Sequence, residues 1–159
     1  EEQKLNQSAF SKAQDMLARQ YFAHADSDGR GLEHWISRAG YAYSVAGENL
    51  SMGYATPAEM VEAWKQSPTH YKNIKDNLFN DIGVAIASGP YEGADTVFAV
   101  QHFGRPKQSA ASAPSPKVIT SEGSKRADER LEPKPKEIAK IEEKAKIEII
   151  SSAIFDLLP

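Results

Sequence analysis

Apolar residues near the start of the chain recur every three or four positions, which is the spacing of one face of an α-helix. This stripe consists of Leu5, Ala9, Ala13, Met16 and Leu17, and Tyr21 continues it. A second, short helix is predicted over residues 31–39. Gly40 is expected to end it, because glycine adopts the left-handed conformation of a helix C-terminus at little cost.

The segment Thr56-Pro57-Ala58-Glu59 has the residues of a helix start. Thr56 can cap the helix, Pro57 suits the first helical position, and Glu59 completes a capping box. The buried face of this helix is then expected to be Met60, Val61 and Trp64, and Pro68 is expected to end it.

Two β-rich runs follow, at residues 81–87 and 96–103. Residues 88–95 between them contain glycine, proline and aspartate, which are typical of a hairpin loop. Helices followed by paired strands predict a domain of the α+β class.

The composition changes near Pro106, which suggests three parts. Residues 1–106 hold the predicted helices and strands, and residues 107–135 form a linker that is first rich in Pro, Ser and Ala and then charged. Residues 136–159 repeat apolar positions at spacings of three and four, which predicts a C-terminal amphipathic helix. It is either a helix cut from a longer protein or, through residues 136–158, a contact with a membrane surface or a partner helix.

Length and charge exclude several classes of protein. The chain has 159 residues, enough for one domain of ordinary size, and a formal net charge of −3 that gives no electrostatic case for nucleic acid. It has no cysteine, which excludes disulfides, a thiolate nucleophile and a thiolate zinc site.

Three side chains are the main candidates for chemistry: His24, Glu48 and His70. Imidazole and carboxylate groups bind divalent metals and transfer protons near neutral pH. Glu48 stands in a stretch with few other charges, so we expect a half-buried carboxylate that is paired with an imidazole or with the backbone. His70 follows the predicted helix end and is expected in a loop beside a cleft.

Other polar residues have competing interpretations. His102 could face the site or solvent, and His34 is expected to pack or to lie at the surface. Ser67 with His70 is conceivable as a nucleophile pair, but no strained elbow motif surrounds the serine. Residues 26–29 are expected to form a turn, because a calcium loop needs a glutamate where this chain has Ser37.

Taken together, the motifs resemble the CAP superfamily of cysteine-rich secretory, antigen and pathogenesis-related proteins, in its cysteine-free bacterial branch. The resemblance covers about residues 5–106, and its segments appear in the family's order. They are Asp15-Met16, Phe22-x-His24, Gly40-Tyr41, Gly47-Glu48-Asn49-Leu50, Trp64-x-x-Ser67-Pro68-x-His70, Ile82-Gly83-Val84 and Gln101-x-Phe103-Gly104.

This resemblance implies an α-β-α sandwich with a central antiparallel sheet and an open cleft. The cleft of many members holds two histidines and two glutamates, where divalent metals have been placed. By motif, His24, Glu48 and His70 match three of the four. Where the family has Trp-x-x-Glu, this chain has Trp64-Lys65-Gln66-Ser67, so Glu62 is the nearest, weaker substitute.

Three such ligands with an open position would suit a water-bearing zinc, calcium or magnesium ion. No organic cofactor is expected. The family also usually opens with a helix before the one at Leu5, so either the chain begins inside the family's domain or the C-terminal helix covers that surface.

Three functions follow from the resemblance. The first is an extracellular or cell-envelope module that binds a small apolar ligand, a glycan or a protein. The second is a metal-dependent hydrolase that uses His24, Glu48 and His70. The third is a structural envelope domain attached through its C-terminal helix. We favour the binding module, because no activated nucleophile is visible and the acid–base set is incomplete.

Overall fold

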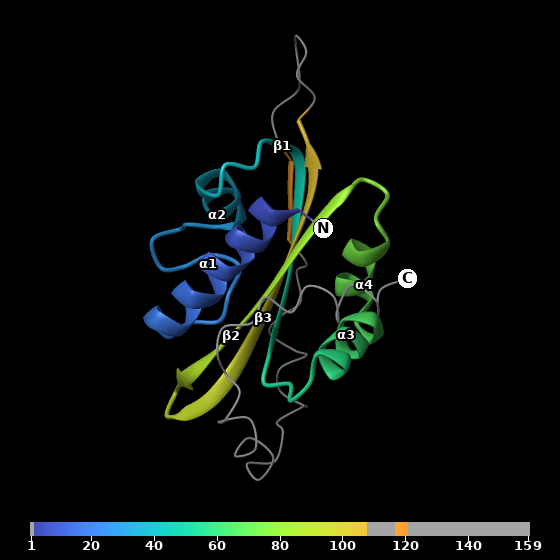
Figure 1. The fold of residues 1–159 in the computed structure, drawn as a ribbon. Helices are drawn as coiled ribbons and strands as arrows, with labels where there is room; N and C mark the ends of the chain where they lie inside the picture. Colours follow the sequence, from blue (N-terminus) through green and yellow to red (C-terminus); the bar gives the residue numbers. More distant parts are fainter. Residues whose placement is uncertain (1, 108–116, 121–159) are drawn as a thin grey trace.

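The structure is a computed structural model, and it describes residues 2–107 and 117–120. The chain forms a four-stranded sheet with helices on both faces (Figure 1). The elements in chain order are α1 (Gln3–Arg19), α2 (Leu32–Arg38), β1 (Tyr43–Met52), α3 (Pro57–Gln66), α4 (Pro68–Lys75), β2 (Asp81–Tyr91), β3 (Ala94–Pro106) and β4 (Lys117–Thr120).

The strand order in the sheet is β2-β3-β1-β4. β3 pairs antiparallel with β1 and β2, whereas β4 pairs parallel with β1, so the sheet is mixed. Helices α1 and α2 lie on one side of the sheet, and α3 and α4 lie on the other (Figure 1). This arrangement confirms the predicted α+β class and α-β-α sandwich.

Helix α1 buries its predicted stripe against the sheet. Ala9, Ala13 and Met16 pack in one cluster with Leu50, Phe98 and Val100 of the central strands. The helix lies very close to β2: a Cβ on Gly83 would stand 2.1 Å from the carbonyl carbon of Leu5. Only glycine fits this contact, which fixes α1 against the edge of the sheet.

The predicted capping box of α3 is confirmed. Thr56 accepts from the Glu59 N–H, and Glu59 accepts from the Thr56 N–H. Trp64 is buried and donates its indole N–H to the Leu50 carbonyl at 3.1 Å. Pro68 does not simply end this helix, because it stands in the first turn of α4.

Two further expectations differ from the structure. The strands of the hairpin are longer than predicted, so that only Glu92 and Gly93, with φ of 51° and 87°, remain as its turn. Strand β4 lies within the stretch expected to be a linker, and it extends the sheet beside β1.

The predicted helix over 136–159 falls outside the described residues. Among the described helices, none combines the length and apolar character needed to span a membrane.

Candidate functional site

Glu48 and His102 are direct partners across the pair β1 and β3. Successive side chains of a strand point to opposite faces, so His102 shares the face of Val100 and Phe98 that α1 covers. Both side chains are fully buried, and the Nε2 atom of His102 lies 3.0 Å from Oε2 of Glu48. His102 therefore faces inward, and Glu48 is more deeply buried than the sequence predicted.

His24 reaches the same carboxylate from the loop after α1. Its Nδ1 atom lies 2.5 Å from Oε1 of Glu48, and its side chain is 20% exposed. The loop is held by Asp26, whose carboxylate accepts from the backbone N–H groups of Asp28 and Arg30 and from the side chains of Arg19 and Arg30. The predicted turn at residues 26–29 is thus confirmed, and it carries His24 to the sheet.

Helix α1 supplies two more polar side chains to this centre. The Ser8 hydroxyl lies 2.8 Å from Nδ1 of His102, which places both ring nitrogens of His102 in hydrogen bonds. Lys12 is completely buried, and its amine donates to the carbonyls of Ala23 and His24 and to the Tyr21 hydroxyl. We call Ser8, Lys12, His24, Glu48 and His102 the polar centre.

Glu48 is ionised in this environment. Burial alone would raise the pKa of its carboxyl, but the hydrogen bonds from His102 and His24 and the charges of His102 and Lys12 outweigh burial and lower that pKa to about 2. The polar centre is therefore a buried anion surrounded by nitrogen donors.

His70 lies in helix α4 and not in the predicted loop. Its Nδ1 atom is 2.8 Å from the Ser67 hydroxyl, and its carbonyl accepts from the Asn49 side chain. Burial, followed by the charge of His24, lowers its pKa to about 4, so the ring is neutral at pH 7. The buried Nε2 atom has no hydrogen-bond partner within the described ranges.

Asn73 of α4 donates to the Glu48 carbonyl and to the Asn49 side chain. This side chain therefore ties α4 to the backbone of β1, whereas the sequence suggested only a local turn. Because neighbouring side chains of β1 alternate, α4 approaches the face of Asn49, opposite the face of the Glu48 carboxylate. His70 is thus carried by the layer of α4, although the charge of His24 still acts on its ring.

The donor atoms present do not fit the metal that the resemblance implied. Across residues 2–107 and 117–120, no group of three or more His, Asp or Glu side chains is placed to hold a metal ion. Both oxygens of Glu48 already accept from imidazole nitrogens. Glu62 lies on the exposed surface of α3, where it accepts from Gln66 and pairs with Lys65.

His34 packs its ring edge-on against Trp35, with 4.8 Å between ring centroids. This contact agrees with the packing role expected of it.

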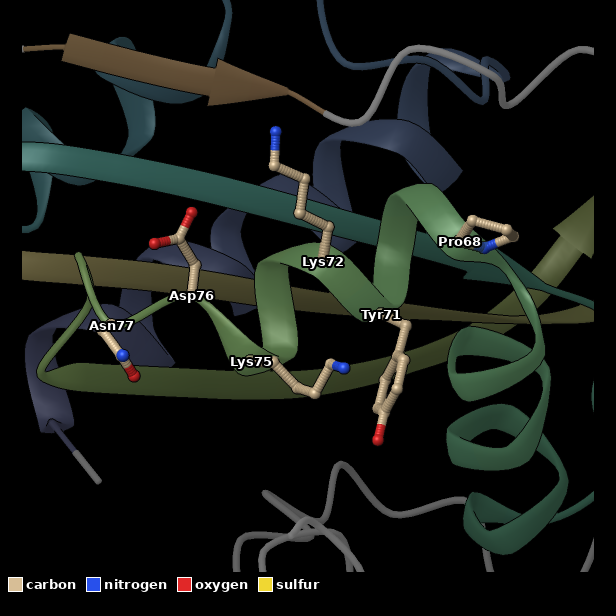
Figure 2. A pocket seen from close by; sticks show the side chains of 6 residues that line it. All are labelled: Pro68, Tyr71, Lys72, Lys75, Asp76 and Asn77. Carbon is tan, nitrogen blue, oxygen red and sulfur yellow. The ribbon is translucent and has the colours of Figure 1, made fainter.

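An open hollow of about 560 Å³ lies beside α4 and the segment that follows it, and Figure 2 shows the side chains that line it. We call it the α4 hollow, and its lining residues are Pro68, Tyr71, Lys72, Lys75, Asp76 and Asn77. The Lys75 amine turns toward Tyr71 and lies 4.4 Å from the centre of its ring. Within the described ranges no ion pair involves Lys72 or Lys75. No member of the polar centre lines this hollow.

The sequence interpretation missed Ser8 and Lys12. A signal was available for Lys12, since it stands three residues after Ala9 and four before Met16, on the buried stripe of α1. A lysine on an apolar stripe usually extends its amine to solvent. Its burial depends on the loop that carries His24, which folds over this part of α1 and accepts hydrogen bonds from the amine. The sequence alone does not show that fold.

Residues 2–103 match the sequence profile of the family described as CAP, the cysteine-rich secretory protein family. The chain belongs to the CAP family. It is 35% identical, over 101 residues, to the uncharacterized protein YkwD of Bacillus subtilis (strain 168), an alignment that covers 64% of this chain and 37% of YkwD.

Two solved structures resemble this CAP domain. One is an extracellular protein with an SCP domain from Bacillus anthracis, with a TM-score of 0.55 and 25% identity over 65% of this chain and 32% of that one. The other is an outer surface protein from Borrelia burgdorferi, with a TM-score of 0.55 and 20% identity over 67% of this chain and 76% of that one. The chain spans about a third of the length of the two Bacillus relatives.

Proposed function

We propose that this CAP domain is a binding module that acts outside the cell or in the cell envelope, and that the α4 hollow is its binding site for a glycan. The observation that carries the proposal is a contrast. In the polar centre, both oxygens of Glu48 and both ring nitrogens of His102 are hydrogen-bonded within the centre. The α4 hollow is lined by an aromatic ring and by two lysines that form no ion pair among the described residues.

The location rests on the relatives. The Bacillus anthracis protein is named as extracellular and the Borrelia burgdorferi protein as an outer surface protein. The absence of cysteine agrees with either place, because a small domain with a well-packed core does not need disulfides.

The lining of the α4 hollow favours a glycan over a small apolar ligand. Sites for apolar ligands are lined mainly by hydrophobic side chains, and here only Pro68 and Tyr71 are of that kind. Sugar hydroxyls can both donate and accept hydrogen bonds. The two lysine amines of the α4 hollow can donate to them, and the side-chain oxygens of Asp76 and Asn77 can accept from them. The volume of about 560 Å³ suits a small ligand, whereas a protein interface needs roughly 800 Å² per partner.

The metal-dependent hydrolase remains a second prediction, with weaker support. It needs Glu48 as a ligand or base, but both of its oxygens are engaged by His24 and His102. The hydrogen bond between Ser67 and His70 has the length of a nucleophile–base contact. However, His70 is a poor base, because its pKa is lowered to about 4.

The test is calorimetric titration of the purified chain with soluble oligosaccharides of N-acetylglucosamine, of glucose and of galacturonate. We expect at least one to bind, with an affinity that Tyr71→Ala and Lys72→Ala each weaken by about tenfold, which is about 1.4 kcal/mol. Lys65→Ala is the matched control, because Lys65 is a lysine of α3 that does not line the α4 hollow.

The proposal fails if none of the three series binds, or if binding is unchanged by Tyr71→Ala and Lys72→Ala. Turnover of an ester or peptide substrate that His24→Ala abolishes would favour the hydrolase instead.

A further inference from the structure

Lys12 brings a full positive charge into the polar centre, but it donates no hydrogen bond to the Glu48 carboxylate. Its side chain is 0% exposed, although lysine is almost never fully buried unless it is paired. Among the described residues, no carboxylate forms an ion pair with its amine, and the hydrogen bonds that the amine donates go to neutral oxygens.

Those oxygens form a small cage. The Lys12 Nζ atom lies 2.7 Å from the Ala23 carbonyl oxygen, 3.2 Å from that of His24 and 3.2 Å from the Tyr21 hydroxyl. An ammonium group has three protons, so these three acceptors satisfy it completely. The ring of Tyr21 lies 4.7 Å from the amine, which adds a cation–π contact.

The cage has the composition of a cation site. Backbone carbonyl and hydroxyl oxygens are the ligands that hard cations prefer in proteins. Carboxylates surround it at longer range: burial lowers the pKa of the Lys12 amine, while the charges of Glu48, Asp15 and Asp26 oppose that effect. Asp15 is linked to the cage directly, since its carboxylate accepts from the Tyr21 hydroxyl at 2.7 Å.

We infer that the Lys12 ammonium is a built-in cation of the polar centre, which occupies an oxygen cage beside Glu48 and holds the His24 loop without a divalent metal. The inference accounts for two observations together. The carboxylate of Glu48 is already engaged by two imidazoles, and within the described part of the chain the positive charge acting on it that does not depend on histidine protonation is that of Lys12 in α1.

The same cage explains how His24 is positioned. Lys12 binds the carbonyl of His24 and the carbonyl before it, so the backbone that presents the imidazole is tied to α1. Glu48 then fixes the ring through Nδ1. Lys12 is therefore a positioning residue, which acts on His24 through its backbone.

The first arm of the test uses the unaltered chain. Calorimetric titration with zinc, calcium and magnesium, and melting with and without EDTA, are expected to show no one-to-one binding and no change in Tm. One-to-one binding of any of the three ions that raises Tm would overturn the inference.

The second arm separates charge from packing. Lys12→Ala empties the cage, and we expect Tm to fall by about 10 °C or more, because several hydrogen bonds and a buried side chain are lost. Adding n-propylammonium should restore part of the loss in Lys12→Ala but leave the unaltered chain unchanged. Lys4→Ala is the matched control, since Lys4 is exposed on the same helix.

Two outcomes of this arm would overturn the inference: equal rescue by uncharged n-propanol, or a Tm of Lys12→Ala close to that of Lys4→Ala. Lys12→Met keeps most of the side-chain volume but removes the charge. It provides a second test in case the Lys12→Ala variant does not fold. In Lys12→Met the ring signals of His24 in NMR spectra should shift, whereas pure space filling would leave them in place.

Discussion

The two polar regions of this domain lie on opposite sides of the same sheet and are built in opposite ways. On the side of α1, a buried carboxylate accepts from two imidazoles, and a buried ammonium group beside it donates to backbone carbonyls and a tyrosine hydroxyl. On the side of α4, two lysines and an aromatic ring border an open hollow. The residues that motif matching marks as functional are thus mostly the enclosed ones.

This difference in burial suggests that the polar centre stabilises the fold and that the α4 hollow binds a ligand. Charges that are buried and mutually hydrogen-bonded strongly affect folding when one partner is removed. Exposed side chains without ion pairs contribute little to folding and remain available to a ligand. If this division is correct, substitutions in the polar centre should change stability first, and substitutions in the α4 hollow should change binding alone.

The largest effect is expected for Glu48→Ala. It removes the acceptor of both imidazoles and the carboxylate charge that most favours the Lys12 ammonium, which should lower the free energy of unfolding by about 3–5 kcal/mol. Urea denaturation followed by tryptophan fluorescence measures this change. A loss below about 1 kcal/mol would mean that the centre is more open to water than its burial indicates.

Acid should act on the same group at a lower pH than on ordinary carboxylates. The pKa of Glu48 is lowered from 4.5 to about 2 in the folded chain, so its stabilising effect is complete above pH 4.5 and is lost as pH falls toward 2. The loss amounts to about 3 kcal/mol for a shift of this size. Denaturation midpoints measured between pH 5 and pH 2 test it, and a flat profile would contradict it.

His70 should give a second pH dependence, because burial, followed by the charge of His24, lowers the pKa of its ring. Its pKa falls from 6.5 to about 4 on folding, so the unfolded chain binds the additional proton between these values. Stability is therefore full above pH 6.5 and declines as pH falls toward 4. His70→Gln should remove this part of the profile and keep the part below pH 4.5. An unchanged slope in the variant would show that another group is responsible.

The smallest effect on stability is expected in the α4 hollow. Lys72→Ala should change the free energy of unfolding by about 0.5 kcal/mol or less, because substitutions of exposed side chains rarely do more, whereas Tyr71→Ala removes a half-buried ring and should cost about 1 kcal/mol. The measurement is the same urea denaturation. A loss above about 2 kcal/mol would mean that these side chains contribute to stability as the polar centre does, and it would contradict the proposed division between the two regions.

Local signals predicted the elements whose cause is local. The apolar stripe of α1 and the capping box at Thr56 depend on residues within one or two turns, and both are confirmed. Strand β1 was missed, because Glu48, Asn49 and Ser51 are polar yet buried, which hides the alternation that marks a strand. Their partners come from β3, α4 and the loop after α1.

The site was predictable only in part, for the same reason. The motifs marked His24 and Glu48 correctly as neighbours, but the direction of His102 depends on strand register, which the sequence left open. The buried position of Lys12 requires the His24 loop to fold over α1. His70 was expected in one cleft with His24 and Glu48; the structure carries it on α4, where its carbonyl accepts from Asn49 and the charge of His24 acts on its ring.

The account is tested most directly by NMR mapping of the oligosaccharide that binds best. Amide shifts in the labelled chain should change around α4 and the segment after it, at Tyr71, Lys72, Lys75 and Asn77, and should stay constant at His24, Glu48 and His102. Shifts that gather instead at those three residues would contradict the assignment of stability to the polar centre and of binding to the α4 hollow.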